Sequence, residues 1–193
     1  MISSLKLLLP EILLSSTALL LLVIDICNLK KVKVYAFIIS LISLAVALGM
    51  VLCTCNQGRA FGMIVVDPFS SYFKALAIVS CFLIFLLSEK DPILMGDQSG
   101  TFSALLLLST VGTLFLSSSE DLLIFFIGLE LTTIPLFIMA GYLRQDIKSS
   151  EGAIKFFLMG AFSTGIMIYG ISYLYGMTGS TSFSVIRDWI SSD

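Results

Sequence analysis

Histidine is absent from the sequence, and charged residues make up only 12% of its 193 positions. The missing histidine excludes Ser-His-Asp triads, His-ligated haem and His-containing zinc sites within the chain. The four cysteines include one close pair and no second pair, which is a poor signal for a metal site. There is also no Gly-x-Gly-x-x-Gly fingerprint for a dinucleotide. We therefore expect neither a cofactor nor a metal ion to bind within this chain.

The low charge also restricts the class of protein. Soluble domains usually carry about 25% charged residues and about 45–50% apolar residues. Here 58% of the residues are apolar and the mean hydropathy is +1.05. The net charge is −2, so there is no basic patch for nucleic acid. The composition predicts an integral membrane protein.

Long apolar runs set the expected number of membrane spans. A bilayer core about 30 Å thick is crossed by about 20 apolar residues in a helix. Six runs meet this length, and short polar segments separate them. The sequence therefore predicts an all-α, polytopic transmembrane bundle, one membrane domain whose helices cover approximately residues 7–27, 34–55, 66–87, 102–118, 122–142 and 151–175.

The last stretch, residues 176–193, is too polar to span a membrane. Phe183, Ile186 and Ile190 recur at helical spacing, which is typical of a short amphipathic helix at the membrane interface. The start of a connecting loop fits the composition equally well. Both interpretations remain open at this stage.

The distribution of lysine and arginine predicts the orientation. Six crossings place both ends of the chain on one side, whose segments carry Lys6, Arg59 and Arg187. Twice as many cations fall on the opposite side: Lys30, Lys31, Lys33, Lys90, Arg144 and Lys148. Because Lys and Arg accumulate on the cytoplasmic or matrix side, we expect the N-terminus to face outward.

The fourth and fifth runs are joined by a very short polar segment. Ser117 and Glu120 have the spacing of a capping box, in which Ser117 would cap the fifth helix. A connection this short predicts an antiparallel helical hairpin.

Glu130 is the residue in the least favourable place for a charge. It lies in the middle of the run 122–142, too deep for a glutamate side chain to reach the interface. A carboxyl group at this depth must be protonated, paired or facing water inside a protein bundle. Pro135 in the same run is expected to kink the helix and to free the carbonyl of Leu131 beside Glu130. Together these features favour a wet polar pocket.

Two lysines are possible basic neighbours. Lys155 lies near the start of the sixth run and differs from Glu130 in depth by roughly 10 Å, so a water-bridged relay is more plausible than a direct ion pair. Lys74 in the third run matches the depth of Glu130 better, although snorkelling to the interface is its favoured interpretation. Glu11 and Asp25 lie near the ends of the first run and are expected to be interfacial.

A resemblance to a known family begins at Gly128-Leu-Glu-Leu-Thr-Thr-Ile-Pro-Leu-Phe. It continues through Ser150-Glu-Gly-Ala-Ile-Lys-Phe-Phe, Gly160-Ala-Phe-Ser-Thr and Tyr175-Gly-Met-Thr-Gly-Ser-Thr, with weaker likeness at Pro10-Glu11-Ile and Val66-Asp67-Pro68-Phe69. In this order and spacing the sequence resembles subunit N, called subunit 2 in mitochondria, of proton-pumping NADH–quinone oxidoreductase, respiratory complex I.

The resemblance implies a role for particular residues. The family is related to Mrp-type sodium/proton antiporters and has about fourteen helices in two inverted repeats. In it, a glutamate on helix five pairs with a lysine on helix seven, and Glu130 matches that glutamate by position. Lys155 matches a lysine common in helix six, whereas Lys74 has no counterpart. The chain corresponds to the N-terminal part only, so we expect either a fragment of a longer or split subunit, whose remainder would supply the partner lysine, or a shortened protein.

The expected function follows from the resemblance. The chain would be a membrane-arm subunit of NADH–quinone oxidoreductase, a proton-translocating enzyme, without a redox active site of its own. NADH, FMN, iron–sulfur clusters and quinone would belong to other subunits. Its partners would be other membrane subunits and the lipid of a bacterial or mitochondrial inner membrane. The alternatives are a non-conducting structural module of the membrane arm and a subunit of an Mrp-type antiporter.

Overall fold

The computed structural model of the chain describes residues 2–27, 30–53, 58–88, 99–143 and 145–192. Within these ranges the chain forms eight helices and one two-stranded antiparallel sheet. Six of the described helices are long and apolar enough to cross a membrane. The expected all-α polytopic bundle is therefore confirmed.

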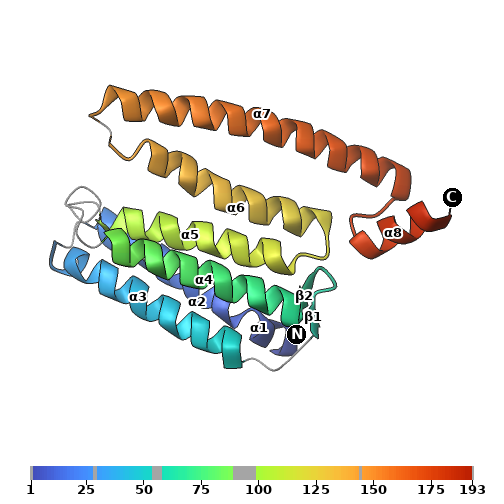
Figure 1. Cartoon of the computed structure of the whole chain (residues 1–193), viewed down its shortest axis with the longest axis horizontal. Coiled ribbons are helices and arrows are strands. Elements are labelled where there is room, and N and C mark those ends of the chain that lie inside the picture. Colours follow the sequence, from blue (N-terminus) through green and yellow to red (C-terminus); the bar gives the residue numbers. More distant parts are fainter. Residues whose placement is uncertain (1, 28–29, 54–57, 89–98, 144, 193) are drawn as a thin grey trace.

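The helices are laid out along the chain with short connections (Figure 1). Their bounds are α1 Ile2–Leu7, α2 Leu9–Ile26, α3 Lys30–Cys53, α4 Pro68–Ser88, α5 Ser99–Ser118, α6 Leu122–Ala140, α7 Ile147–Thr178 and α8 Phe183–Ser192. The helix α7 is longer than the expected span 151–175. It begins earlier because the side chain of Asp146 accepts a hydrogen bond from the backbone N–H of Lys148 at 3.0 Å and caps the helix before the apolar run starts.

The centre of the bundle is α5. In its most apolar stretch, 72% of the residues are buried, compared with 28–33% in the corresponding stretches of α2, α3 and α4. It packs against all three of these helices and against α6. By contrast, none of the corresponding stretch of α7 is buried, and Figure 1 shows α7 on the far side of α6 from the bundle. The protein thus has a packed region, α2–α5, and an open region, α6–α7.

The turn between α5 and α6 forms the expected antiparallel hairpin but not the expected capping box. Ser117 is still inside α5, and its hydroxyl donates to the carbonyl of Leu114 at 2.8 Å. Asp121 is the residue that caps α6, where its carboxylate accepts from the N–H of Leu123 at 2.8 Å. The prediction for Ser117 and Glu120 was wrong because the Ser117 hydroxyl bonds back into the last turn of α5 and Asp121, nearer to Leu122, takes the capping position.

Several extended segments meet at the end of the bundle that holds the N-terminus. The strands β1 (Gly58–Ala60) and β2 (Ile64–Val66) pair in an antiparallel hairpin. The N–H of Glu120 donates to the carbonyl of Met63 at 2.8 Å, and the N–H of Phe183 donates to the carbonyl of Glu120 at 3.1 Å. Backbone hydrogen bonds therefore connect the hairpin to the α5–α6 turn, and that turn to the start of α8.

The segment expected to be an interfacial helix or a loop contains the helix α8. Ile186 on this helix is buried, and the ring of Phe183 lies 6.5 Å from that of Phe125 at the start of α6. The segment therefore packs on the open region as a helix. Its position at a membrane interface stays a prediction.

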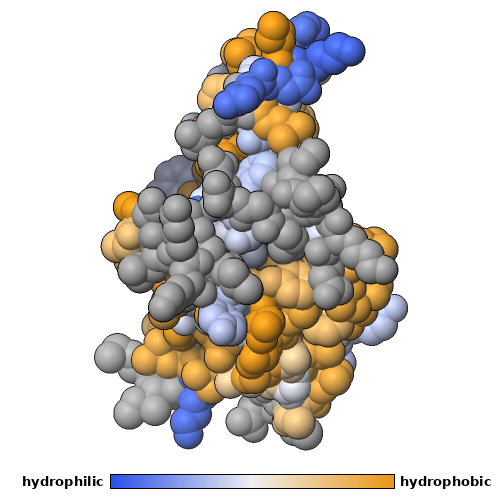
Figure 2. Space-filling model, turned by 90° about the vertical axis from the view of Figure 1, so that its left-hand side faces the viewer, coloured by the Kyte–Doolittle hydropathy of each residue, from blue (hydrophilic) through white to orange (hydrophobic). Residues whose placement is uncertain are grey.

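The outer surface of the described helices is largely apolar. Figure 2 views the molecule from the end where α7 begins and shows apolar side chains over the flanks of the packed region, with hydrophilic ones around the start of α7. Large exposed side chains such as Leu20 on α2, Ile42 on α3 and Leu87 on α4 contribute to this surface. A surface of this kind suits lipid or neighbouring membrane helices.

Candidate functional site

Glu130 lies near the middle of α6. It follows Leu122 by eight residues and precedes Ala140 by ten, which places it about 12 Å and about 15 Å from the two ends of the helix. Its side chain is partly buried. A glutamate cannot extend over either distance, so this carboxyl group depends on partners inside the protein.

One face of α6 packs closely on α5 through small residues. A Cβ on Gly112 of α5 would lie 2.5 Å from the backbone nitrogen of Thr132, and a Cβ on Gly128 would lie 3.0 Å from that of Leu116. The hydroxyl of Ser109 donates to the carbonyl of Thr132 at 3.1 Å. The two backbones approach each other more closely than larger residues permit, and this contact fixes the rotation of α6.

A second face of α6 holds Glu130 and meets α7. Glu130 Oε1 accepts a hydrogen bond from the hydroxyl of Thr164 at 2.8 Å. Phe137 lies two turns after Glu130 on α6. Its ring lies over Gly160, one turn before Thr164 on α7, and packs edge-on against Phe156, with ring centres 4.7 Å apart. Thr164 is thus the described partner of Glu130. Sequence reasoning did not single it out, although it belongs to the Gly160-Ala-Phe-Ser-Thr motif.

Pro135 is buried inside α6, one turn beyond Leu131. Because proline has no N–H, the carbonyl of Leu131 loses its ordinary helical donor next to Glu130. The helix is nevertheless assigned without a break from Leu122 to Ala140. Pro135 therefore adds a second polar group near the carboxyl, and the kink that it was expected to cause stays a prediction.

The structure pairs Lys155 with Glu151, not with Glu130. The two side chains form an ion pair one helical turn apart on α7, and both are exposed, at 72% and 57%. Lys155 precedes Thr164 by nine residues on the same helix, about 13 Å along its axis. A direct contact between Lys155 and Glu130 is absent from the described contacts, in agreement with the difference in depth expected from the sequence.

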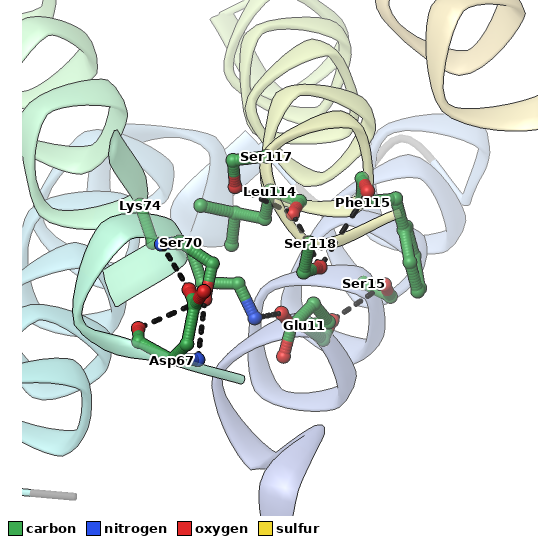
Figure 3. Close-up of polar contacts among 9 residues, drawn as sticks. All are labelled: Glu11, Ser15, Asp67, Ser70, Lys74, Leu114, Phe115, Ser117 and Ser118. Atoms are coloured by element: carbon green, nitrogen blue, oxygen red, sulfur yellow. Dashed lines mark hydrogen bonds and ion pairs between the residues drawn. The ribbon is translucent and has the colours of Figure 1, made fainter. Parts of the chain in front are cut away.

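Lys74 corrects the sequence-based interpretation most strongly. It does not snorkel to the interface: its Nζ lies 2.6 Å from Glu11 Oε1, and the two side chains are only 3% and 1% exposed. Figure 3 shows the Lys74 amine directed at Glu11 between α4 and α2. Glu11 is correspondingly not a free interfacial carboxylate. The sequence could not reveal this pair because the two residues are 63 positions apart.

Asp25 also has a partner on another helix. It accepts a hydrogen bond from the N–H of Thr101 at 3.1 Å and another from the Thr101 hydroxyl. Asp25 thereby caps the start of α5 from the end of α2. Burial, together with the nearby Asp25 carboxylate, raises the pKa of Tyr142 to about 12. Asp25 lies near the end of its helix, as expected, but it fastens α2 to α5 there.

Two of the described carboxylates, Glu11 and Glu130, have different surroundings. Glu11 has a buried ammonium group, whereas Glu130 has a hydroxyl donor and a carbonyl nearby. No group of three or more Cys, Asp or Glu side chains suited to a metal ion occurs among the residues that the structure describes. The two sites therefore differ in the group that faces the carboxylate, an ammonium at Glu11 and a hydroxyl at Glu130.

Comparison with known proteins connects this arrangement to a family. Residues 119–191 match the family model described as NADH:quinone oxidoreductase/Mrp antiporter, TM. NADH-quinone oxidoreductase subunit N 1 of Solibacter usitatus is 38% identical over 181 residues, covering 93% of this chain and 37% of the relative. Subunit N of Cytophaga hutchinsonii is 38% identical over 184 residues, covering 94% and 40%. NAD(P)H-quinone oxidoreductase subunit 2 of a Synechococcus strain is 33% identical over 186 residues, covering 94% and 35%.

Solved structures show the same fold. A chain of respiratory complex I from Thermus thermophilus with bound aureothin superposes with a TM-score of 0.73 at 27% identity, covering 90% of this chain and 38% of that one. A chain of the archaeal membrane-bound sulfane sulfur reductase gives 0.74 at 18% identity, covering 95% and 39%, and shows the fold alone. The chain belongs to the family of the N subunits of NADH-quinone oxidoreductase and spans 35–40% of the length of these curated relatives.

Proposed function

We propose that this chain is part of a membrane-arm subunit of NADH–quinone oxidoreductase and contributes to proton translocation driven by electron transfer from NADH to quinone. Its relatives bear the name of that enzyme. The observation that carries the proposal is Glu130, a partly buried carboxyl in the middle of a span, held by Thr164 at 2.8 Å. Ionisable groups at such depth are costly and are usually functional.

The proposed mechanism is electrostatic. An ionised Glu130 stabilises a nearby ammonium group and raises its proton affinity. When the two groups separate, the ammonium pKa falls and a proton is released. At an effective dielectric constant of about 20, unit charges 4 Å apart interact by about 4 kcal/mol, which corresponds to about three pKa units. A change of this size is sufficient to drive one proton step.

The basic partner of Glu130 is proposed to come from outside the six spans. Among the described residues, Lys74 is bound to Glu11 and Lys155 to Glu151. A helix of the same subunit or of a neighbouring chain would therefore supply the cation at the exposed side of α6 and α7. Lys155 would act further along the same route, reached through water, and the carbonyl freed by Pro135 would help to hold that water.

The proposal includes a location and an orientation. The chain would lie in a bacterial or mitochondrial inner membrane, surrounded by lipid and by other membrane subunits of the complex. The lysine and arginine distribution supports an outward N-terminus, although two of the cations counted for it, Lys90 and Arg144, lie outside the described residues. NADH, FMN, iron–sulfur clusters and quinone would be bound by other subunits.

Two alternatives lead to different expectations. A non-conducting structural module is favoured by one observation: the described partner of Glu130 is a hydroxyl and not a cation. A subunit of an Mrp-type antiporter is consistent with the family model, which covers both groups, but the curated relatives named above are quinone oxidoreductase subunits.

The test is Glu130→Gln in the complete enzyme. In inverted membrane vesicles we expect fewer protons translocated per electron, while the amount of assembled complex on a native gel stays close to that of the parent. The variant Asp188→Asn, which removes an exposed carboxylate on α8, is the matched control. An unchanged proton-to-electron ratio for Glu130→Gln would leave Glu130 with a packing role and would favour the structural module.

A further inference from the structure

The packed region contains its own buried charge pair, away from Glu130. Lys74 Nζ and Glu11 Oε1 are 2.6 Å apart, and neither side chain is more than 3% exposed. Removing two such groups from water costs several kcal/mol each, and the attraction between them repays this only when their remaining hydrogen-bonding positions are also satisfied. If all their hydrogen-bonding positions were satisfied, the pair could be explained as a structural contact between α2 and α4 alone.

The hydrogen bonding of this pair is incomplete among the described residues. Glu11 Oε2 is buried and has no hydrogen-bond partner there. Lys74 has three N–H donors, of which one is used, toward Glu11. Buried carboxylate oxygens without a partner are rare, and each one calls for an explanation. A water that donates to Oε2 would satisfy its hydrogen bonding, and a proton on the carboxyl group would remove its negative charge.

A groove with hydroxyl groups in its lining passes one helical turn from Lys74. This groove, of about 830 Å³, runs between α4 and α5, and its polar end is lined by Asp67, Ser70, Ser117 and Ser118. Ser70 precedes Lys74 by one turn on the same buried face of α4. Figure 3 shows Ser70 and Ser118 in the immediate surroundings of the pair. The groove therefore brings hydroxyl groups, and space for water, to within one helical turn of Lys74, and Glu11 and Lys74 themselves are not among the residues that line it.

Few other charges act on Glu11. The span of α3 from residue 35 to 53 and the whole of α5 contain no ionisable acid or base apart from cysteine and tyrosine. Asp25, the other acid on α2, is fourteen residues away, about 21 Å along the helix. Lys6 at the end of α1 precedes Glu11 by five residues and is exposed. The remaining charges near the groove are Asp67 at the start of α4 and Glu120, which pairs with Arg59. Lys74 is therefore the dominant charge at Glu11.

We propose that Glu11 and Lys74 form a second proton-linked charge pair, which exchanges one proton with the groove between α4 and α5. When Glu11 takes up a proton from the groove, its carboxylate becomes a carboxylic acid, Lys74 stays an ammonium, and the net charge of the pair rises from zero to plus one. Release of the proton to the groove restores the ion pair. This inference rests on the proposed proton-translocating function.

The competing explanation is a purely structural pair that fastens α4 to α2. Both explanations allow a neutral replacement of the two residues to assemble, because well-packed neutral groups often replace a buried ion pair without loss of stability. They differ in proton translocation. A structural pair has no influence on the number of protons moved per electron, whereas a proton-linked pair does.

The experiment compares Glu11→Gln and the double variant E11Q/K74M with the parent in the complete complex, in inverted membrane vesicles. Assembly is measured on a native gel, and translocation as protons moved per electron. The control R187M/D188N neutralises an exposed charge pair on α8 and also leaves the net charge unchanged. We expect E11Q/K74M to assemble and to move fewer protons per electron, with the control at the parental ratio.

The outcomes separate this inference from the proposed function. A parental ratio in E11Q/K74M, alongside a lowered ratio in Glu130→Gln, overturns the inference and leaves the proposed function intact. If E11Q/K74M does not accumulate, the ratio of Glu11→Gln decides in the same way. Loss of assembled complex in both variants means that the pair serves folding, and this also overturns the inference.

Discussion

The packed region and the open region each contain a carboxylate, and the two carboxylates differ in burial and in their partners. In the packed region, Glu11 has a lysine 2.6 Å away on a neighbouring helix, and both side chains are closed off from the surface. In the open region, Glu130 is only partly buried and has Thr164 as its described partner. The helix that presents Thr164, α7, has no buried residue in its apolar stretch.

The difference shows which of the two charge sites is balanced in charge. Glu11 on α2 and Lys74 on α4 are both buried and in contact, so their charges can balance each other inside the chain. Glu130 is partly buried and has a hydroxyl donor, which does not balance a negative charge. The second site is therefore the one for which we propose a cation from beyond α2–α7.

We expect the largest loss of stability from breaking the ion pair between Glu11 and Lys74. Lys74→Met leaves Glu11 buried without its cation, and we expect a loss of about 3–5 kcal/mol in stability. The amount of assembled complex and its thermal unfolding midpoint measure this. Unchanged stability would mean that Glu11 is already neutral or reaches solvent, and the contrast between the two regions would disappear.

We expect the second-largest loss of stability at the close contact between α5 and α6, which orients Glu130. Gly112→Ala places a methyl group 2.5 Å from the backbone of Thr132, so α5 and α6 must separate, at a cost of about 1–3 kcal/mol. The matched control is Gly165→Ala on α7, where no atom lies within 4 Å of the new Cβ. That control should be neutral or should raise stability by about 0.5–1 kcal/mol. Equal effects in thermal unfolding would show that the close approach is not needed.

Thr164→Val sharpens the comparison at Glu130 itself. Valine keeps the shape of the side chain and removes the hydroxyl that donates at 2.8 Å. We expect a loss of about 1 kcal/mol in stability, and a smaller decrease in protons per electron than for Glu130→Gln. A decrease as large as that of Glu130→Gln would make Thr164 the principal partner and would remove the need for an outside cation.

The smallest effect on stability is expected at Lys155. Its exposed pair with Glu151 is worth about 0.2–0.5 kcal/mol, so Lys155→Met should leave assembly and the unfolding midpoint nearly unchanged. Proton translocation measured on the same vesicles then reports its role alone. A parental ratio would remove Lys155 from the proposed route.

The architecture could be predicted from the sequence because a helix that crosses the bilayer core needs about 20 apolar residues. Six apolar runs gave the six candidate spans, and the motif around Glu130 gave the family. The bounds differ where a polar side chain acts locally, as Asp146 does in starting α7 early and as Asp121 does in capping α6.

The partners of charged residues could not be predicted in the same way. Hydropathy placed Lys74 and Glu11 at the interface, because a single sequence does not show which helices touch. The depth of Glu130 could be counted along its own helix, but its partner Thr164 lies on α7, and the sequence does not show which face of α7 meets α6. Contacts between distant segments depend on helix rotation, which small residues such as Gly112 set.

The most direct measurement of the central claim is an experimental structure of the assembled membrane arm at a resolution that shows side chains and water. The account predicts a lysine or arginine side chain from another helix, or a chain of ordered water leading to one, beside the Glu130 carboxyl group. Lipid acyl chains packed directly against that carboxyl, with no basic residue or water near it, would contradict the account.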